Sequence, residues 1–357
     1  AIAQGKGKHK MFCAGCGSKV GPDVLSSVMQ LLRESAYGTV VPELEEADDA
    51  AILDAKESCG TLVHSVDFFT SFVEDPFVFG AIAANHALSD VYAMGARPKS
   101  ALAIAVVPYG SAEKLRDGLF QLLAGACSVL AAAGCKLGGG HSVQGPEMAL
   151  GFAAVGEVRG DGVILKKSGL REGHKLILTK ALGTGVILAG EMRGMCKSVW
   201  LDGAIESMLK LNEAAVDVAL NFGATACTDV TGFGLVGHLR EMVVASGASV
   251  QLEMDRIPLL EGALELAEQG VKSSLYEGNF SMRKVKAPGG CGGEGSGDAD
   301  SRLPLLFDPQ TSGGMLFSVP PSYVQSCLAE LRACGFSQSA CIGTVMAIDQ
   351  SEIIEIV

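Results

Sequence analysis

The sequence lacks the features of a membrane or secreted protein. No run approaches the roughly 18 apolar residues of a membrane span, and the best one, 101–107, ends at Pro108. The first ten residues contain lysines but no apolar core follows them, so they do not form a signal peptide. The 11 cysteines are scattered and odd in number. We therefore expect a cytoplasmic protein with reduced thiols and no disulfide framework.

Basic residues are too few to offset the acidic ones. Charged side chains make up only 19% of the chain, against about 25% in an average protein. The 28 Lys and Arg face 40 Asp and Glu, which gives a net charge of −12. This balance argues against non-specific binding to nucleic acid or to anionic membranes. A substrate that carries phosphate would need local groups that offset the negative electrostatic field of the protein.

The length of 357 residues favours two domains, since a domain has about 100–200 residues. The residue pattern of the sequence changes over 159–174, where we place the domain boundary. We predict a mobile catalytic loop over 1–20, one domain over 21–160 and an α+β domain over 161–357. Residues 287–300 are rich in glycine and read as a flexible insertion within the second domain.

Helical and strand patterns are mixed without a long βαβ series, which favours the α+β class. The predicted helices follow Pro22 and span 79–94, 112–133, 202–221, 235–246, 259–268 and 323–334. The predicted strands span 61–66, 100–107, 148–158, 175–179, 225–230 and 248–255, with two short ones at the end of the chain. Between the helix 112–133 and the strand 148–158, we expect Gly138 to His141 to form a loop.

Aspartates recur where predicted elements end, namely Asp48, Asp49, Asp67, Asp90 and Asp229. Each of them alone is well explained as a cap of a helix or a turn. As a group they suggest more, because Mg²⁺ takes carboxylate oxygens together with substrate phosphates. Two unit charges about 5 Å apart repel by roughly 3 kcal/mol at an effective dielectric of 20. An acidic cluster would exclude a polyphosphate unless divalent ions lay between them, so the group predicts a metal or metal–nucleotide site.

Two glycine-rich segments offer phosphate-binding alternatives, although the sequence has no Walker A motif. The segment GGGHS (138–142) could present backbone N–H groups to an anion, or be a plain turn. The segment TDVTGFGLVGHL (228–239) contains G-x-G-x-x-G, with Glu253 about 20 residues on, as in NAD-dependent oxidoreductases. We disfavour that reading because Asp229 would face the pyrophosphate without a counter-ion. Asp229 as a metal ligand, with glycines that allow close helix packing, fits better.

The N-terminal segment CAGCGSK (13–19) carries the strongest candidate nucleophile. Half a zinc site and a redox pair are both poorly supported, because no second C-x-x-C and no thioredoxin-like βαβ context is present. Beside Lys19, Cys16 could have a lowered pKa and act as a nucleophile or a chalcogen carrier. The alternative is an ordinary thiol in a mobile tail. The segment DPQTSGG (308–314) by itself predicts only an ordered loop before a strand.

Together these segments resemble the selenophosphate synthetase (selenide, water dikinase) family. The motifs GCGSK, ADDAA, SVDFF, HALSDVYAMG, GGGHS, TDVTGFGLVGHL and DPQTSGG stand in the family's order from about Cys13 to about Val345. The parent superfamily, aminoimidazole-ribonucleotide-synthetase-like proteins, implies two α+β domains. It also implies a homodimer whose N-terminal domains pair into a shared β-barrel. The implied reaction consumes ATP, selenide and water, and it releases selenophosphate, AMP and phosphate.

The resemblance also implies roles for single residues. Cys16 and Lys19 match the catalytic pair, and Lys19 would also touch the phosphates. The matches to Mg²⁺ ligands are Asp49, Asp90 and Asp229. The matches to nucleotide contacts are Glu46, Ala47, Asp48, Asp67 and Asp90, with Gly140, His141 and Ser142 reaching the nucleotide across the dimer.

The chain departs from its relatives at some positions. His86 stands where relatives often have Asn, and the 287–300 insertion is unusual. The FCAGCGSKVG version resembles members fused behind a flavin-dependent NADH-dehydrogenase-like domain. Because the chain begins without Met, it fits a fragment of such a longer protein. A purine-biosynthetic cyclo-ligase and a thiamine-phosphate kinase are rival activities in the superfamily, but neither explains GCGSK.

Overall fold

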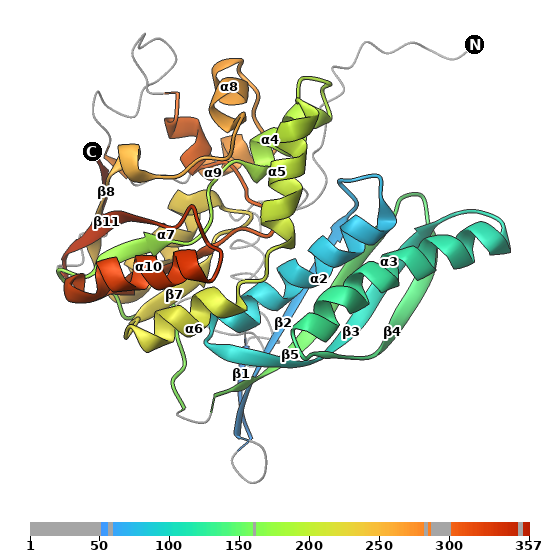
Figure 1. Cartoon of the computed structure of the whole chain (residues 1–357), viewed down its shortest axis with the longest axis horizontal. Helices are drawn as coiled ribbons and strands as arrows, with labels where there is room; N and C mark the ends of the chain where they lie inside the picture. Colours follow the sequence, from blue (N-terminus) through green and yellow to red (C-terminus); the bar gives the residue numbers. More distant parts are fainter. Residues whose placement is uncertain (1–50, 56–59, 160–161, 282–284, 287–300, 349–352) are drawn as a thin grey trace, which may run out of the picture.

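The computed structural model describes residues 51–55, 60–159, 162–281, 285–286, 301–348 and 353–357. The predicted catalytic loop, the helix after Pro22 and the insertion 287–300 lie outside the described residues. Two β-sheets with their helices lie side by side, and α2 (Pro76–Ala93) runs close to the junction between them (Figure 1). The chain is α+β, as the sequence predicts.

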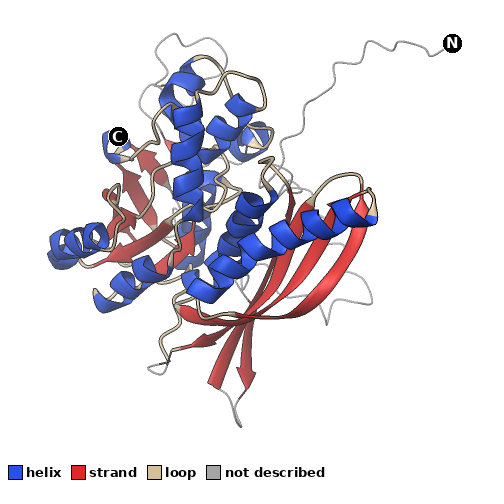
Figure 2. Ribbon diagram, turned by 45° about the vertical axis from the view of Figure 1, so that its right-hand side comes forward, coloured by secondary structure: helices blue, strands red, loops and turns tan. Residues whose placement is uncertain are grey.

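The first sheet is formed by the N-terminal half. Its strands, in the order β1-β2-β5-β3-β4, are β1 (Ala51–Ala55), β2 (Gly60–Thr70), β5 (Ala149–Val158), β3 (Ala96–Pro108) and β4 (Lys136–Gly145). Neighbouring strands are antiparallel except β3 and β4, which are parallel and joined by α3 (Ala112–Ala132). Helices α2 and α3 pack together over one face of this sheet, as Figures 1 and 2 show.

Helix α2 begins where its sequence favours a start. The Asp75 side chain accepts hydrogen bonds from the backbone N–H groups of Phe77 and Val78, and Pro76 needs no such acceptor. The helix is buried on nearly every side, because it packs against β2, β5 and α3 and also against α5 (Ser198–Leu209) and β7 (Ala226–Asp229). It therefore holds the two halves of the described structure together, and a polar side chain on it is costly to bury unless it finds a partner.

Helix α3 is long and apolar enough to cross a membrane by length and composition. That is weak evidence, because core helices of soluble proteins pass the same test. Leu122, Ala126 and Leu130, spaced four residues apart, are buried in the core it shares with α2. The opposite side, which includes Phe120, faces outward. This pattern is that of a helix lying on a sheet.

The other face of the first sheet exposes apolar side chains in adjacent rows. Val66 and Phe68 on β2 are 62% and 46% exposed, and Leu102 and Ile104 on β3 are 48% and 40% exposed. On β4, the exposed Val143 pairs with Val106 of β3, which points to the same face as Leu102 and Ile104. A contiguous apolar sheet face of this kind marks an interaction surface.

The predicted loop at 138–141 is wrong, since these residues lie within strand β4. Gly140 pairs with Ala103 of β3, and a Cβ at Gly140 would come within 2.1 Å of the Ala103 carbonyl oxygen. Glycine is needed there for close strand approach, whereas its abundance in the sequence suggested a turn. In a strand, successive N–H groups point to opposite edges, so they do not converge on one anion.

The second sheet has seven strands in the order β7-β10-β6-β11-β8-β12-β9. Besides β7, they are β6 (Lys175–Leu178), β8 (Ser249–Leu252), β9 (Val285–Lys286), β10 (Met315–Val319), β11 (Ala340–Ala347) and β12 (Ile354–Ile356). Its helices are α4 (Thr184–Glu191), α5, α6 (Glu213–Asn221), α7 (Gly234–Ser246), α8 (Ala263–Glu268), α9 (Tyr276–Ser281) and α10 (Val324–Ala333). All strands of the first sheet precede residue 159, and the exact domain limits stay a prediction.

One predicted helix, 202–221, is instead two. Helix α5 ends at Leu209, and α6 begins at Glu213. The buried Asn212 between them donates from Nδ2 to the Gly313 carbonyl oxygen (2.9 Å) and to Ser89 Oγ (3.2 Å). The break frees the backbone carbonyl groups of Met208 and Lys210 for long-range hydrogen bonds, which apolar periodicity could not predict.

Candidate active site

Strand β2 and helix α2 bring two predicted site aspartates onto one surface. Ser65 Oγ donates a hydrogen bond to Asp90 Oδ2, and His86 Nε2 lies 3.5 Å from Asp67 Oδ2. Ser65 and Asp67 point to the same face of β2 because they are two residues apart, and His86 and Asp90 are one turn apart on α2. The Asp67 side chain is 12% exposed and His86 only 1%. Both carboxylates are thus held by α2–β2 contacts.

The loop 308–314 contacts His86 through the ring nitrogen that does not face Asp67. The Ser312 N–H donates to His86 Nδ1 at 2.9 Å, and Ser312 Oγ donates to the Met208 carbonyl oxygen at 2.7 Å. Ser312 has φ of 48°, and a Cβ at Gly313 would lie 2.0 Å from the Val230 carbonyl oxygen. The backbone is therefore held in a conformation that only close packing from several sides can maintain.

A buried lysine holds Ser312 from the other side. Lys180 Nζ donates to the carbonyl oxygens of Lys210 (2.7 Å) and Ser312 (3.1 Å), and the residue is 4% exposed. Burial, with help from the nearby charge of Lys210, lowers the Lys180 pKa to about 7, although Asp229 opposes the shift. Asp229 ends β7 and is 2% exposed. Lys180 thus lies within the electrostatic reach of a third predicted site aspartate.

The start of the same loop caps helix α4. Asp308 Oδ2 accepts from the Val186 N–H at 2.6 Å, and Gln310 Oε1 accepts from the Gly183 and Thr184 N–H groups at 2.9 and 3.1 Å. Burial raises the pKa of the Asp308 carboxyl to about 7. Sequence reasoning saw only an ordered loop here. The signal it passed over was a run of polar residues between buried apolar segments, which predicts internal partners for each of them.

The structure brings some predicted site residues together and separates others. Asp67 and Gly140 lie in one row across the first sheet, through Phe152 and Ala103. At about 4.8 Å per strand, the three steps place them roughly 14 Å apart. His141 pairs with Ile104 and so faces the exposed apolar side, away from α2. The remaining predicted site residues, which lie outside the described residues, are Cys16, Lys19, Glu46, Ala47, Asp48 and Asp49.

The predicted metal cluster is not assembled by described side chains alone. Within those ranges, no three His, Cys, Asp or Glu side chains lie close enough together to hold a metal ion. Asp49 is beyond them, so its grouping with Asp90 and Asp229 stays a prediction. The donor chemistry fits Mg²⁺, since the predicted ligands are carboxylates and no soft sulfur or imidazole ligand is among them.

Four of the cysteines that the structure describes are poor nucleophiles. Burial raises the pKa of Cys135 to about 11 and that of Cys327 to about 12, and it also raises the pKa values of Cys196 and Cys341. All seven described cysteines are free thiols: Cys127, Cys135, Cys196, Cys227, Cys327, Cys334 and Cys341. Burial disfavours the thiolate form of four of them, whereas Cys127 and Cys334 are exposed, so the role of Cys16 as a nucleophile stays a prediction from its motif.

The dinucleotide-binding context of G-x-G-x-x-G is absent around 232–237. Strand β7 pairs antiparallel with β10, and β8, which follows α7, is separated from β7 by three strands. A dinucleotide fold would place them as parallel strands of one βαβ unit. The glycines instead serve packing, because a Cβ at Gly234 would lie 2.8 Å from Phe307 backbone and one at Gly237 would lie 2.5 Å from Phe233.

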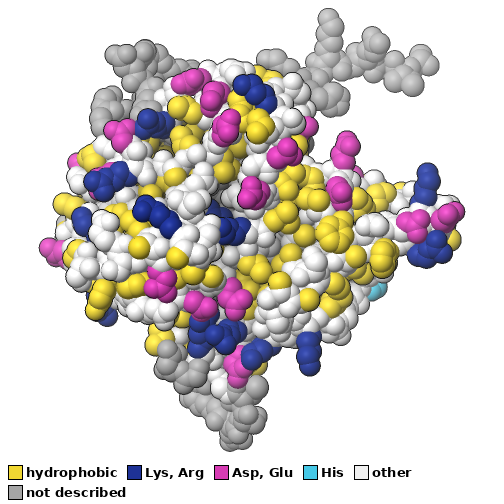
Figure 3. All heavy atoms as spheres, viewed as in Figure 1, with side chains coloured by type: hydrophobic (Ala, Val, Ile, Leu, Met, Phe, Trp, Pro, Cys, Tyr) yellow, Lys and Arg dark blue, Asp and Glu magenta, His cyan; other side chains and the backbone are white. Residues whose placement is uncertain are grey.

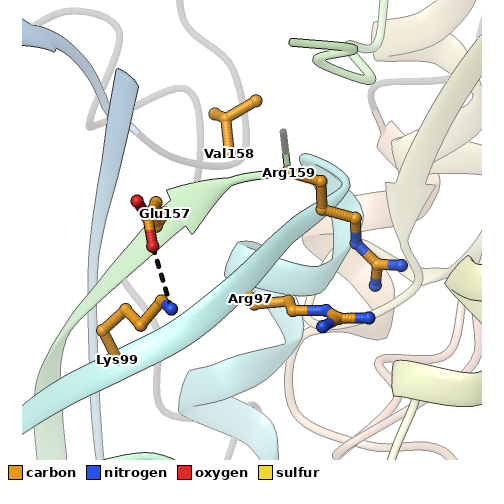
Figure 4. A pocket seen from close by; sticks show the side chains of 5 residues that line it. All are labelled: Arg97, Lys99, Glu157, Val158 and Arg159. Carbon is orange, nitrogen blue, oxygen red and sulfur yellow. Dashed lines mark ion pairs between the residues drawn. The ribbon is translucent and has the colours of Figure 1, made fainter. Parts of the chain in front are cut away.

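Two pockets in the described structure are lined by neither Asp67 nor Asp90. A pocket of about 380 Å³ is lined by Arg97, Lys99, Glu157, Val158 and Arg159, and Figure 4 shows Lys99 paired with Glu157 (2.8 Å) while both guanidinium groups turn away from them. Glu157 pairs with Leu62, five residues or roughly 17 Å along β2 from Asp67. The second, of about 340 Å³, has Lys180 and Lys210 in its wall.

The surface charges do not suggest a binding site for an extended polyanion such as a nucleic acid. On the face that Figure 3 shows, Lys and Arg side chains are interspersed with Asp and Glu, and apolar atoms lie between them. No single-sign patch covers that face, which agrees with the acidic composition of the chain.

Comparisons with known proteins agree with this architecture. Residues 47–158 match "AIR synthase related protein, N-terminal domain", and residues 171–355 match the corresponding C-terminal domain. Among solved structures, the HypE–HypF complex superimposes with a TM-score of 0.67 at 14% identity, covering 93% of this chain and 95% of that one. Thiamine monophosphate kinase from Aquifex aeolicus gives 0.65 at 17%, covering 94% and 96%. These likenesses establish the fold.

Curated relatives are considerably closer in sequence. The "Selenide, water dikinase" of Caldanaerobacter subterraneus is 40% identical over 306 residues, which are 86% of each chain. That of Clostridioides difficile is 36% identical over 335 residues, 93% of each chain. The two-domain fold, the matches to both family domains and this identity over most of the length lead to one assignment: the chain belongs to the selenide, water dikinase family.

Proposed function

We propose that this enzyme makes selenophosphate from ATP, selenide and water and releases AMP and phosphate. The observation that carries the proposal is the extended sequence identity to selenide, water dikinases, taken with the two carboxylates that β2 and α2 hold side by side. The γ-phosphoryl group passes to selenide, and water then cleaves the remaining ADP at its β-phosphate. The NAD-dependent alternative loses its support with the antiparallel pairing of β7.

Asp67, Asp90 and Asp229 are the described aspartates of the proposed nucleotide and metal site. Carboxylates repel a triphosphate, so the site requires cations between them. Asp49, Asp90 and Asp229 would hold Mg²⁺, which neutralises phosphate oxygens when it is bound. Ser65 orients the Asp90 carboxylate by donating a hydrogen bond to Oδ2. Asp67, steadied by His86, would contact the nucleotide.

The remaining roles fall on residues outside the described ranges. Lys19 would close over the phosphates and steady the incoming selenide anion. Cys16 would hold the selenium or shield the phosphorylated intermediate, and Glu46, Ala47 and Asp48 would contact the nucleotide. Closure of this N-terminal segment would exclude water from the first transfer. These assignments rest on the matching motifs.

The apolar face of the first sheet supports a homodimer. Val66, Phe68, Leu102 and Ile104 are too exposed for an isolated protein to leave uncovered at no cost. A second copy that pairs the same face would complete a shared barrel, and an isologous contact of this kind is the commonest in homodimers. His141, which faces this side, would then reach the nucleotide of the partner, while the pairing covers the apolar rows.

The free thiols support a cytoplasmic location, because described cysteines form no disulfide. A flavin-dependent oxidoreductase domain ahead of this chain remains a prediction from the N-terminal motif alone.

Phosphorus NMR tests the reaction. The protein with ATP, Mg²⁺ and selenide should produce a selenophosphate resonance and AMP in equal amounts, with one phosphate for each. A reaction that stops at ADP, or that proceeds equally without selenide, would refute the proposal. A Lys19→Met variant that keeps the fold should lose turnover.

A further inference from the structure

His86 joins the two sheets through both of its ring nitrogens. Nδ1 lies 2.9 Å from the backbone nitrogen of Ser312, in the second half of the chain, and Nε2 lies 3.5 Å from Asp67 Oδ2, in the first half. The ring is 1% exposed and packs edge-on against Phe69 at 5.0 Å between ring centroids. Its orientation is therefore fixed by packing as well as by the two polar contacts.

The Ser312 contact also decides which nitrogen carries the proton. A backbone N–H can only donate, so Nδ1 must be the acceptor and have no hydrogen. In the neutral ring the proton then lies on Nε2, which is the nitrogen that faces Asp67. The loop thus selects the tautomer in which His86 is a donor toward the carboxylate.

The loop can do this because it is itself held tightly. Lys180 Nζ donates to the Ser312 carbonyl oxygen, and Asn85 Nδ2 donates to Ser312 Oγ at 3.1 Å and to the Met208 carbonyl oxygen at 2.7 Å. These buried contacts leave Ser312 little freedom to withdraw its N–H. A chain of contacts therefore runs from Lys180 through Ser312 and His86 to Asp67.

We propose that His86 is a positioning residue, which aims the Asp67 carboxylate at the nucleotide in a tautomer set by Ser312. The proposal rests on the proposed function only in taking Asp67 as a nucleotide contact. It predicts that His86 acts on ATP binding through Asp67, whereas a purely structural histidine would act through stability alone.

Two substitutions separate the two ring contacts. In His86→Asn, the side-chain oxygen can replace Nδ1 as the acceptor for Ser312, but the side chain ends before the position of Nε2. We expect a modest drop in melting temperature, because ring atoms packed against Phe69 are lost, and ATP binding that is weaker by about fivefold. His86→Gln has the opposite effect on the two contacts. Its amide nitrogen can occupy the Nε2 position, while the acceptor for the Ser312 N–H is lost. We expect a lower melting temperature with ATP affinity within about twofold.

A double-mutant cycle with Asp67→Asn supplies the decisive readout. Calorimetric titration with ATP and Mg²⁺, without selenide, should show that His86→Asn adds no further loss in the Asp67→Asn background. In turnover, His86→Asn should raise the KM for ATP and leave kcat nearly unchanged. His174→Asn, a histidine bonded to Thr225 Oγ1 in the second half, is the matched control and should change neither quantity.

Three results would each overturn the proposal: additive losses in the cycle, unchanged ATP binding in His86→Asn, or a larger loss of ATP affinity in His86→Gln than in His86→Asn. The proposed function fails separately. If the wild-type protein makes no selenophosphate but the cycle shows coupling, the function falls and the positioning role stands. If selenophosphate forms and the cycle is additive, the reverse holds.

Discussion

The Lys180 ammonium group lies 3.1 Å from the carbonyl oxygen of Ser312, although 132 positions separate the two residues in the chain. Lys180 follows strand β6, and Ser312 lies in the loop before β10, so the antiparallel pairing of these two strands brings them together. Within the described part of the chain, Lys180 has no carboxylate at ion-pair distance, and carbonyl oxygens solvate its charge instead. The arrangement has measurable consequences for stability.

Lys180 should make stability depend on alkaline pH. Burial lowers its pKa from 10.5 to about 7, so between these values the unfolded chain binds a proton that the folded protein has lost. The free energy of unfolding attributable to this group therefore rises as pH increases above about 7. Urea denaturation at several pH values up to 9 should show that Lys180→Met removes this rise. The control Lys114→Met, at an exposed position of α3, should keep it.

Asp308 should act in the opposite sense. Its pKa is raised from 3.8 to about 7, so between these values the folded protein holds a proton that the unfolded chain has released. The stability contributed by this group is complete below about pH 4 and declines as pH rises toward 7. Asp308→Asn keeps an acceptor for the Val186 N–H and abolishes the decline. Equal pH slopes for the variant and the wild-type protein in urea titrations would contradict the assignment.

Asp90 and Asp229 should be required for magnesium-dependent ATP binding. Asp90→Asn and Asp229→Asn remove one charge each with little change in shape, and we expect affinity to fall at least about tenfold, while the fold remains intact. Calorimetry with ATP in the presence and absence of Mg²⁺ measures the effect. Asp255→Asn, whose side chain is 92% exposed, is the control. Unchanged binding in either site variant would remove that residue from the site.

Charges on the apolar sheet face should break the proposed dimer. Phe68→Glu with Ile104→Glu would bury carboxylates between apolar rows, so light scattering should report a monomer. Phe120→Glu, on the outward side of α3 and 66% exposed, should leave the dimer intact. A wild-type monomer, or a double variant that remains dimeric, would show that this face is not the interface.

Gly140→Ala should weaken the pairing of β3 and β4. Its Cβ would meet the Ala103 carbonyl oxygen at 2.1 Å, so the strands must separate. We expect a loss of about 1–3 kcal/mol in the free energy of unfolding. Gly278→Ala, in a helix with nothing within 4 Å of the new Cβ, should be neutral or stabilising. Equal effects of the two substitutions in denaturant titrations would exclude the steric explanation.

Apolar periodicity and capping residues determined most elements of the fold. The α3 pattern and the strand that ends at Val158 follow from local preferences, so the sequence was sufficient to predict them. The predicted start of α2 at Phe79 missed its first turn, which begins at Pro76 after the Asp75 cap. Ordered motifs were also enough to predict the family. Local patterns failed where glycine was read as a turn in β4, and where the Lys210–Asn212 connection divides a predicted helix.

Only the tertiary structure decided what surrounds the aspartates. The pairing of His86 with Ser312, the burial of Lys180 and the capping of α4 by Asp308 and Gln310 join residues more than 100 positions apart. Such contacts leave no periodic trace in a single chain, because each depends on how two sheets pack against one helix. The sequence predicts which side chains carry the chemistry, and the directions and protonation states of the described ones arise only from long-range packing.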